Sequence, residues 1–189
     1  NDPRRAIYFR NLDSLGNVTS PAEHGLDGAY ADFSQPGNIL EDPTHPGILL
    51  SYAEVCFHLA DAANRGWSVG GDAATHYANG VSASMLQWGS DQASADAFLL
   101  ETDVAWDASM ADQRIGTQKW VAMYDQGLEA WCTWKMYDYP TMGVAAQAGT
   151  ITPTRYNYSV DEYSVNSINT SAANGGSDLT TDRVFWDVD

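Results

Sequence analysis

The sequence predicts a mainly α-helical fold built of tetratricopeptide-like helical hairpins, with long irregular loops and minor short strands. Two segments, 48–65 and 73–88, carry apolar residues at helical spacing and are joined by a short glycine-rich connection. A third segment, 113–137, carries a stripe of aromatic residues with the same period. Turn-forming glycines and prolines fill residues 1–47 instead. These patterns together indicate helices that pack on one another and are connected by loops.

Residues 1–47 are predicted to form a loop-rich segment. Only residues 6–9, Ala-Ile-Tyr-Phe, resemble a short strand. Turn formers such as Gln-Pro-Gly at 35–37 and His-Pro-Gly at 45–47 follow them. A loop of this length is unusual in a compact domain unless it has a role, so we expect function in this segment.

The next two segments are predicted to form an antiparallel helical hairpin. The helix over 48–65 buries a stripe that consists of Tyr52, Val55, Cys56, Leu59, Ala62 and Ala63. The helix over 73–88, with Asp72 as its N-cap, buries a second stripe that consists of Tyr77, Val81, Ser84, Met85 and Trp88. Because the connection is short, Tyr52, Val55 and Leu59 should face Tyr77, Val81 and Met85. The pair is typical of one tetratricopeptide hairpin.

A short helix is predicted near 93–100. The segment over 113–137 is then predicted to be one continuous helix, which Pro140 ends. Its apolar positions recur three, four and seven residues apart, at Trp120, Met123, Tyr124, Gly127, Trp131 and Trp134. We therefore expect Trp120 and Trp131 in the core. Glycine is unfavourable inside a helix, so Gly127 should mark the close approach of a neighbouring helix.

The chain is predicted to be one domain portion, 1–189, with three parts. Residues 1–47 are its loop-rich segment, 48–140 its helical core and 141–189 a loop-rich C-terminal segment. Within the last part, one helical turn is expected at 160–163 and a short closing strand at 183–187.

Composition excludes one class of partner and suggests another. With 9 Lys+Arg against 25 Asp+Glu, the formal net charge is −16, and such a field repels phosphate backbones. We therefore expect no nucleic-acid ligand. Seven Trp and ten Tyr beside many Asn and Asp side chains are the materials of carbohydrate sites, although the same residues also build cores.

No motif predicts catalysis, a metal or a cofactor. The histidines are scattered, and the aspartates Asp27, Asp32 and Asp42 lack the spacing of a calcium loop. No Gly-x-Ser-x-Gly motif or reactive cysteine is present. The carboxylate pairs, Glu54 with Asp61 and Asp125 with Glu129, are just as natural on solvated helix faces. We therefore assign no catalytic residue.

Four ordered segments carry a resemblance to a known family. They are Asn-Asp-Pro-Arg at 1–4 with Tyr-Phe at 8–9, Ser-Tyr-Ala-Glu-Val at 51–55 with Arg-Gly-Trp at 65–67, Tyr-Ala-Asn-Gly-Val at 77–81, and Gln-Lys-Trp at 118–120 with Gly-Leu-Glu-Ala-Trp at 127–131 and Tyr-Pro at 139–140. This set resembles the SusD/RagB family of nutrient-binding outer-membrane lipoproteins, and the match corresponds to the family's C-terminal portion. One departure is Trp-Lys-Met-Tyr at 134–137, where the family has an arginine-rich turn.

The resemblance implies a function at the bacterial outer surface. It implies non-catalytic capture of glycans or other nutrients, and their delivery to a TonB-dependent (SusC-like) outer-membrane transporter. The protein would be surface-exposed on the outer membrane and lipid-anchored through an N-terminal segment that this chain lacks. The family's glycan-contacting aromatics follow no fixed motif, so no binding residue is carried over from it.

Ligand contacts are expected in loops, because packing occupies the helix stripes. Two loops place aromatic residues beside hydrogen-bonding partners. One contains Asp27, Tyr30 and Phe33, and the other contains Trp106. A sugar ring could stack on Tyr30 or Trp106. The alternative is that these aromatics hold long loops against the helical body.

Two other functions stay open. A helical-repeat scaffold that binds only proteins would show a regular repeat and a polar concave groove, and the long loops speak against it. A helical toroid glycoside hydrolase would show turnover of a polysaccharide.

Overall fold

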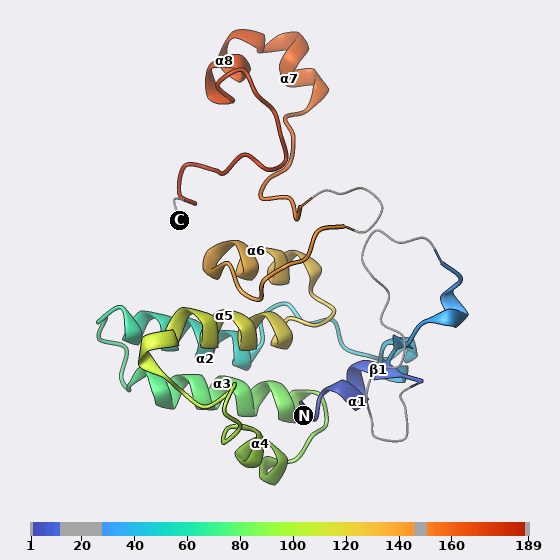
Figure 1. Cartoon of the computed structure of the whole chain (residues 1–189), viewed down its shortest axis with the longest axis vertical. Helices are drawn as coiled ribbons and strands as arrows, with labels where there is room; N and C mark the ends of the chain where they lie inside the picture. Colours follow the sequence, from blue (N-terminus) through green and yellow to red (C-terminus); the bar gives the residue numbers. More distant parts are fainter. Residues whose placement is uncertain (1, 12–27, 146–150, 188–189) are drawn as a thin grey trace. The chain divides into compact units, whose positions relative to one another are not determined.

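A computed structural model describes residues 2–11, 28–145 and 151–187, and they form a mainly α-helical protein (Figure 1). The chain divides into two units. One contains residues 2–11 and 28–141, and the other contains 142–145 and 151–187. Each is described by itself. None of the helices in the described ranges is both long and apolar enough to cross a membrane.

The first unit is built on a hairpin of α2 (Tyr52–Asn64) and α3 (Ala73–Gln87), which run antiparallel beside each other (Figure 1). Each helix starts at a capped N-terminus. The Ser51 hydroxyl accepts the Glu54 N–H at 3.0 Å, and the Asp72 carboxylate accepts the Thr75 N–H at 2.7 Å. The predicted hairpin and its Asp72 cap are therefore confirmed.

The hairpin buries the predicted face of α3 but a different face of α2. Tyr52 is 68% exposed, whereas the side chains that point inward are Ala53, Cys56, Phe57 and Ala60. The predicted α2 stripe is thus wrong apart from Cys56. The Phe57 ring lies so close to Gly80 of α3 that a Cβ there would be 3.0 Å from it. Since α2 is apolar on two sides, its period alone does not select the face that fits its neighbour.

Three more helices complete this core. They are α4 (Gln92–Phe98), α5 (Ala111–Ala122), which follows the short 3₁₀ turn η3 (Ala108–Met110), and α6 (Gly127–Tyr137). Helix α5 packs across α2 and α3, and α6 folds back on α5 (Figure 1). The short helix near 93–100 is confirmed. The predicted continuous helix over 113–137 is wrong, because the chain turns at 123–126, where Asp125 has a φ of 65°.

This break changes the roles of the residues around it. Gly127 becomes the first residue of α6, and no atom lies within 4 Å of where its Cβ would be. The close approach occurs instead at Gly116, where a Cβ would lie 2.5 Å from that of Tyr137. Trp120 and Trp131 are only half-buried, so their prediction as core residues is also wrong. The aromatic stripe predicted over 113–137 is divided between α5 and α6, so its residues do not share one helix face.

The N-terminal segment forms a small two-stranded arm. Residues 6–9, predicted as a strand, lie mostly in helix α1 (Arg5–Tyr8), and the strand β1 (Phe9–Arg10) begins only after it. β1 pairs antiparallel with β2 (Gln35–Pro36), between the 3₁₀ turns η1 (Tyr30–Asp32) and η2 (Asn38–Glu41). Gly37 is required where the two segments meet, since a Cβ there would be 1.8 Å from the Ile7 carbonyl oxygen.

One hydrophobic core joins the helices of the first unit. Its buried members come from α2 to α6 and from the linker before α5, and include Phe57, Tyr77, Val81, Met85, Phe98, Ile115 and Met123. Alanines of α2, α4 and α5 belong to the same cluster, so large and small side chains together fill the closely packed core.

The second unit contains the short helices α7 (Val160–Val165) and α8 (Ser167–Ala173). Asp178 accepts the Tyr158 N–H at 3.1 Å and pairs with Arg155, so it joins the two ends of the unit. The predicted helical turn at 160–163 is confirmed and is longer than expected. The predicted strand at 183–187 is wrong, because these residues form a turn in which the Asp187 N–H bonds the Val184 carbonyl at 2.9 Å.

Candidate functional site

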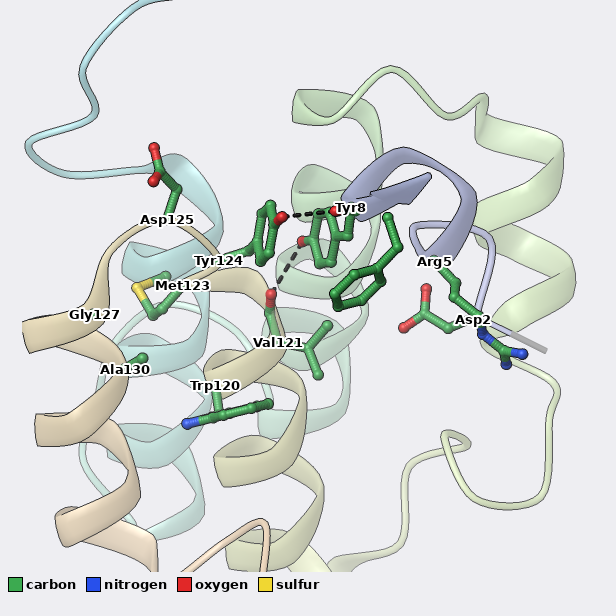
Figure 2. A pocket seen from close by; sticks show the side chains of 11 residues that line it. Asp2, Arg5, Tyr8, Trp120, Val121, Met123, Tyr124, Asp125, Gly127 and Ala130 are labelled. Carbon is green, nitrogen blue, oxygen red and sulfur yellow. Dashed lines mark hydrogen bonds between the residues drawn. The ribbon is translucent and has the colours of Figure 1, made fainter. Parts of the chain in front are cut away.

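An aromatic pocket of about 560 Å³ opens between the N-terminal arm and the α5–α6 turn (Figure 2). Its walls come from both sides of this junction and include Asp2, Arg5, Tyr8, Phe9, Trp120, Met123, Tyr124 and Asp125. The same turn that breaks the predicted helix therefore forms one side of the pocket. The helical period of the sequence placed Trp120, Met123 and Tyr124 on a packed stripe and gave no sign of the pocket.

One wall of the pocket is formed by an aromatic cluster. The rings of Tyr8 and Tyr124 stack with centroids 4.0 Å apart, and Trp88 meets them edge-on at 5.1 and 5.4 Å. The Tyr8 hydroxyl donates to the Val121 carbonyl at 3.0 Å, and the Tyr124 hydroxyl donates to the Tyr8 carbonyl at 2.6 Å (Figure 2). Burial raises the pKa of the Tyr8 hydroxyl well above its usual value, so this group stays protonated.

The pocket offers ring faces but few free polar groups. Both tyrosine hydroxyls already donate to backbone carbonyls. The Asp2 carboxylate is held by Arg4 at 2.7 Å, and the Asp125 carboxylate points away from the stacked rings (Figure 2). Such a lining suits an apolar group or the flat face of a ring better than a set of hydroxyls.

A buried arginine fixes the arm that carries Tyr8. Arg4 is fully buried, and its guanidinium donates to the Asp2 carboxylate, to the Ser84 hydroxyl at 2.9 Å and to Gln118 Oε1 at 2.7 Å. It also lies 5.5 Å from the centre of the Phe98 ring. Arg4 thus links the chain start to α3, α4 and α5. Arginine is rarely buried, so composition gave no signal for this role.

A second buried polar group joins α2 to α5. Lys119 lies with its ammonium 3.0 Å from His58 Nε2, and Glu54 lies 3.7 Å from the same nitrogen. Because an ammonium only donates, His58 must accept here as neutral imidazole. Burial lowers the pKa of Lys119, and burial together with Lys119 lowers the pKa of His58. The carboxylate of Glu54 is thus part of a packed polar contact. Asp61, which the sequence pattern paired with Glu54 as a carboxylate pair, forms an ion pair with Arg65 at 2.9 Å.

The predicted ligand residues lie at separate places. Tyr30 is 62% exposed in η1, and the ring of Phe33 packs over Gly28. Trp106 is half-buried and rests on Tyr77 of the core, with ring centroids 5.3 Å apart. Asp27 lies outside the described residues. The structure therefore groups Tyr30 with Phe33, and it places Trp106 on the helical body.

No group of three or more His, Cys, Asp or Glu side chains that could hold a metal ion occurs in the described ranges.

Comparison with known proteins gives one consistent result. A family profile described as "Starch-binding associating with outer membrane" (SusD-like) matches residues 1–159. No curated protein matches the chain.

The chain is also similar to several solved structures, among them SusD homologues. A chitin-binding SusD homologue from Flavobacterium johnsoniae is 28% identical, with a TM-score of 0.78, over 99% of this chain and 46% of that one. A structure described as a chitin-binding protein is 34% identical, with a TM-score of 0.71, over 86% of this chain and 38% of that one. A SusD homologue from Bacteroides vulgatus has a TM-score of 0.80 at 24% identity, over 99% of this chain and 46% of that one. The chain therefore spans less than half of the length of each of these relatives.

Proposed function

Because the chain belongs to the SusD-like family, we propose that the protein captures a glycan, or another nutrient, at the bacterial outer surface without changing it chemically. The observation that carries this proposal is the family match over residues 1–159. Two of the similar structures are described as chitin-binding, which supports a polysaccharide as the ligand class.

The proposed ligand contacts are the loop aromatics. Tyr30 presents an exposed ring, which suits stacking against the apolar face of a sugar. Phe33 lies in the same segment, while Trp106 has one face against Tyr77 and so contributes less ring area. Asp27 stays a predicted contact in the segment that the described ranges omit.

The proposed partner is a TonB-dependent outer-membrane transporter of the SusC-like class, to which the glycan would be delivered. The proposed location is the outer-membrane surface, where a lipid anchor would hold the full-length protein. The description of the matching family as associating with the outer membrane supports both proposals. Co-purification of the tagged full-length protein with an outer-membrane transporter tests the partner. Protease treatment of intact cells tests the location.

Calorimetry with the full-length protein tests capture directly. Starch- and chitin-derived oligosaccharides are titrated into the wild type and into Tyr30→Ala and Trp106→Ala variants. A sugar stacked on a ring contributes on the order of 1 kcal/mol, so loss of a contacting ring should weaken binding several-fold. Binding of no glycan by the wild type would contradict the proposal. Release of reducing ends from the polysaccharide would favour the hydrolase alternative.

Binding of a protein is the second candidate function, and the apolar lining of the aromatic pocket favours it. A Trp120→Ala substitution distinguishes the two. It should leave glycan affinity unchanged if Tyr30 contacts the sugar, and it should weaken a protein complex if the pocket is the contact surface.

A further inference from the structure

We propose that Arg10 organises a polar surface around Tyr30, and that this surface, formed with Gln35, Asn38 and Glu41, binds the hydroxyl and amide groups of an uncharged oligosaccharide. The inference rests on the proposed glycan capture and assigns its hydrogen-bonding residues. It concerns the N-terminal arm and is separate from the aromatic pocket.

The side chain of Arg10 contacts two neighbouring elements, β2 and η2. It leaves β1 and donates from Nε to Gln35 Oε1 on β2 at 3.0 Å. Its Nη1 donates to Asn38 Oδ1 at 3.0 Å, and its two terminal nitrogens donate to the Glu41 carboxylate at 2.8 and 2.6 Å. The fork of one guanidinium thereby fixes the positions of three polar side chains.

The orientation of the two amides follows from the chemistry of arginine. A guanidinium has only donors, so the carbonyl oxygens of Gln35 and Asn38 must face Arg10. Their NH₂ groups are consequently turned away from Arg10, and Asn38 is exposed. The two amides thus present N–H donors, and Glu41 presents acceptor lone pairs. Sugar hydroxyls and acetamido groups need this combination of donors and acceptors.

The aromatic part of the surface lies near the same guanidinium. Tyr30 is close enough to Arg10 to help raise the pKa of the guanidinium, after the larger effect of Glu41, and 62% of Tyr30 remains exposed. An exposed ring held beside fixed amides and a carboxylate matches a sugar, which has one apolar face and a rim of hydroxyls.

The charges of this surface indicate a neutral ligand. The positive charge of Arg10 is paired with the negative charge of the Glu41 carboxylate, so the cluster carries no net charge of its own. The whole chain carries −16, which disfavours polyanions such as uronic-acid polymers. An uncharged hexose or N-acetylhexosamine chain needs no unpaired charge on this surface and is not repelled by the negative charge of the chain.

Isosteric substitutions in the full-length protein test the inference. Asn38→Asp and Gln35→Glu keep the oxygen that faces Arg10 but replace the outward NH₂ group with a second oxygen. Each is expected to weaken binding of maltoheptaose or chitohexaose about three- to ten-fold, which corresponds to one lost hydrogen bond. Tyr30→Ala should weaken binding by a similar factor, and none of the three variants should lower the melting temperature appreciably.

The matched control is Asn79→Asp, the same change at an exposed asparagine of α3, which should leave affinity unchanged. Wild-type affinity in Asn38→Asp, Gln35→Glu and Tyr30→Ala would overturn the inference and leave glycan capture standing. Preferential binding of polygalacturonate would overturn the neutral ligand class. If the wild type binds no glycan at all, the proposed function fails and this inference fails with it.

Discussion

Tyr8 and Tyr124 stack with their ring centroids 4.0 Å apart and their planes within 11° of parallel, although 116 positions separate them in the chain. Each hydroxyl also bonds a carbonyl oxygen across the contact, Tyr8 to Val121 and Tyr124 to Tyr8. This pair attaches the N-terminal arm to the end of α5. It therefore links the segment that carries Arg10 to the helical core.

Removing the Tyr8 ring should loosen this attachment. Tyr8 is buried, so Tyr8→Ala should lower the free energy of unfolding by about 3–5 kcal/mol. Tyr8→Phe keeps the stacking and loses only the hydrogen bond to Val121, at a cost of about 1 kcal/mol. Urea denaturation of the two variants checks the order, and equal losses would show that stacking contributes little.

The two glycines near α5 and α6 should respond oppositely to alanine. Gly116→Ala places a Cβ 2.5 Å from that of Tyr137 and should be destabilising by about 1–3 kcal/mol, as for an overpacked core. Gly127→Ala meets no neighbouring atom within 4 Å. It should be neutral or stabilising by up to about 1 kcal/mol, because alanine favours a helix. Melting temperatures of the two variants test the break between the helices, since a continuous helix packed at Gly127 would reverse the result.

Arg4→Met should strongly destabilise the first unit. It removes the partner of Asp2 and leaves Ser84 and Gln118 without their donor. Loss of one member of a buried ion pair costs about 3–5 kcal/mol, and because Asp2 is a quarter exposed, the lower end applies. Arg65→Met removes an exposed pair with Asp61 and should cost at most about 1 kcal/mol. Chemical denaturation measures both, and similar costs would contradict a structural role for Arg4.

Stability should fall when the pH drops below the usual pKa of histidine, and His58 should account for part of that fall. Its folded pKa is lowered, first by burial and then by Lys119, so the unfolded chain takes up a proton before the folded one. The contribution of His58 to the free energy of unfolding is therefore complete above about pH 6.5, and it is lost as the pH falls through the lower pKa of His58 in the folded state. The nearby carboxylates of Glu54 and Asp61 oppose this shift without cancelling it.

A comparison with His58→Gln isolates this effect. Glutamine can still accept from Lys119 but does not titrate. The free energy of unfolding is measured between pH 5 and pH 8 for both proteins. The wild type should lose more stability than the variant over this range, and parallel pH profiles would show that His58 does not titrate differently in the two states.

Several features followed from local sequence because local physics decides them. Asp72 caps α3 through a bond to the Thr75 N–H within its own turn. The stripe that starts at Tyr77 in α3 and ends at Trp88, its C-cap, is buried as its period predicted. Pro140 marked the end of the helical run, which stops at Tyr137. The ordered motifs likewise indicated the family, which the match over residues 1–159 confirms.

Tertiary packing decided the structural features that local sequence did not. The turn at Asp125 lies inside a run with continuous helical period, and the run turns back there so that α6 can pack on α5. Which face of α2 is buried depends on Gly80 of another helix, and Arg4 becomes a buried link only when α3 and α5 supply Ser84 and Gln118. The polar surface at Arg10 exists because β1 meets β2 and η2. The sequence alone determined the helical hairpin and the family, because caps and periods act over a few residues. Both candidate binding surfaces required the tertiary structure, because each joins side chains that are distant in the chain.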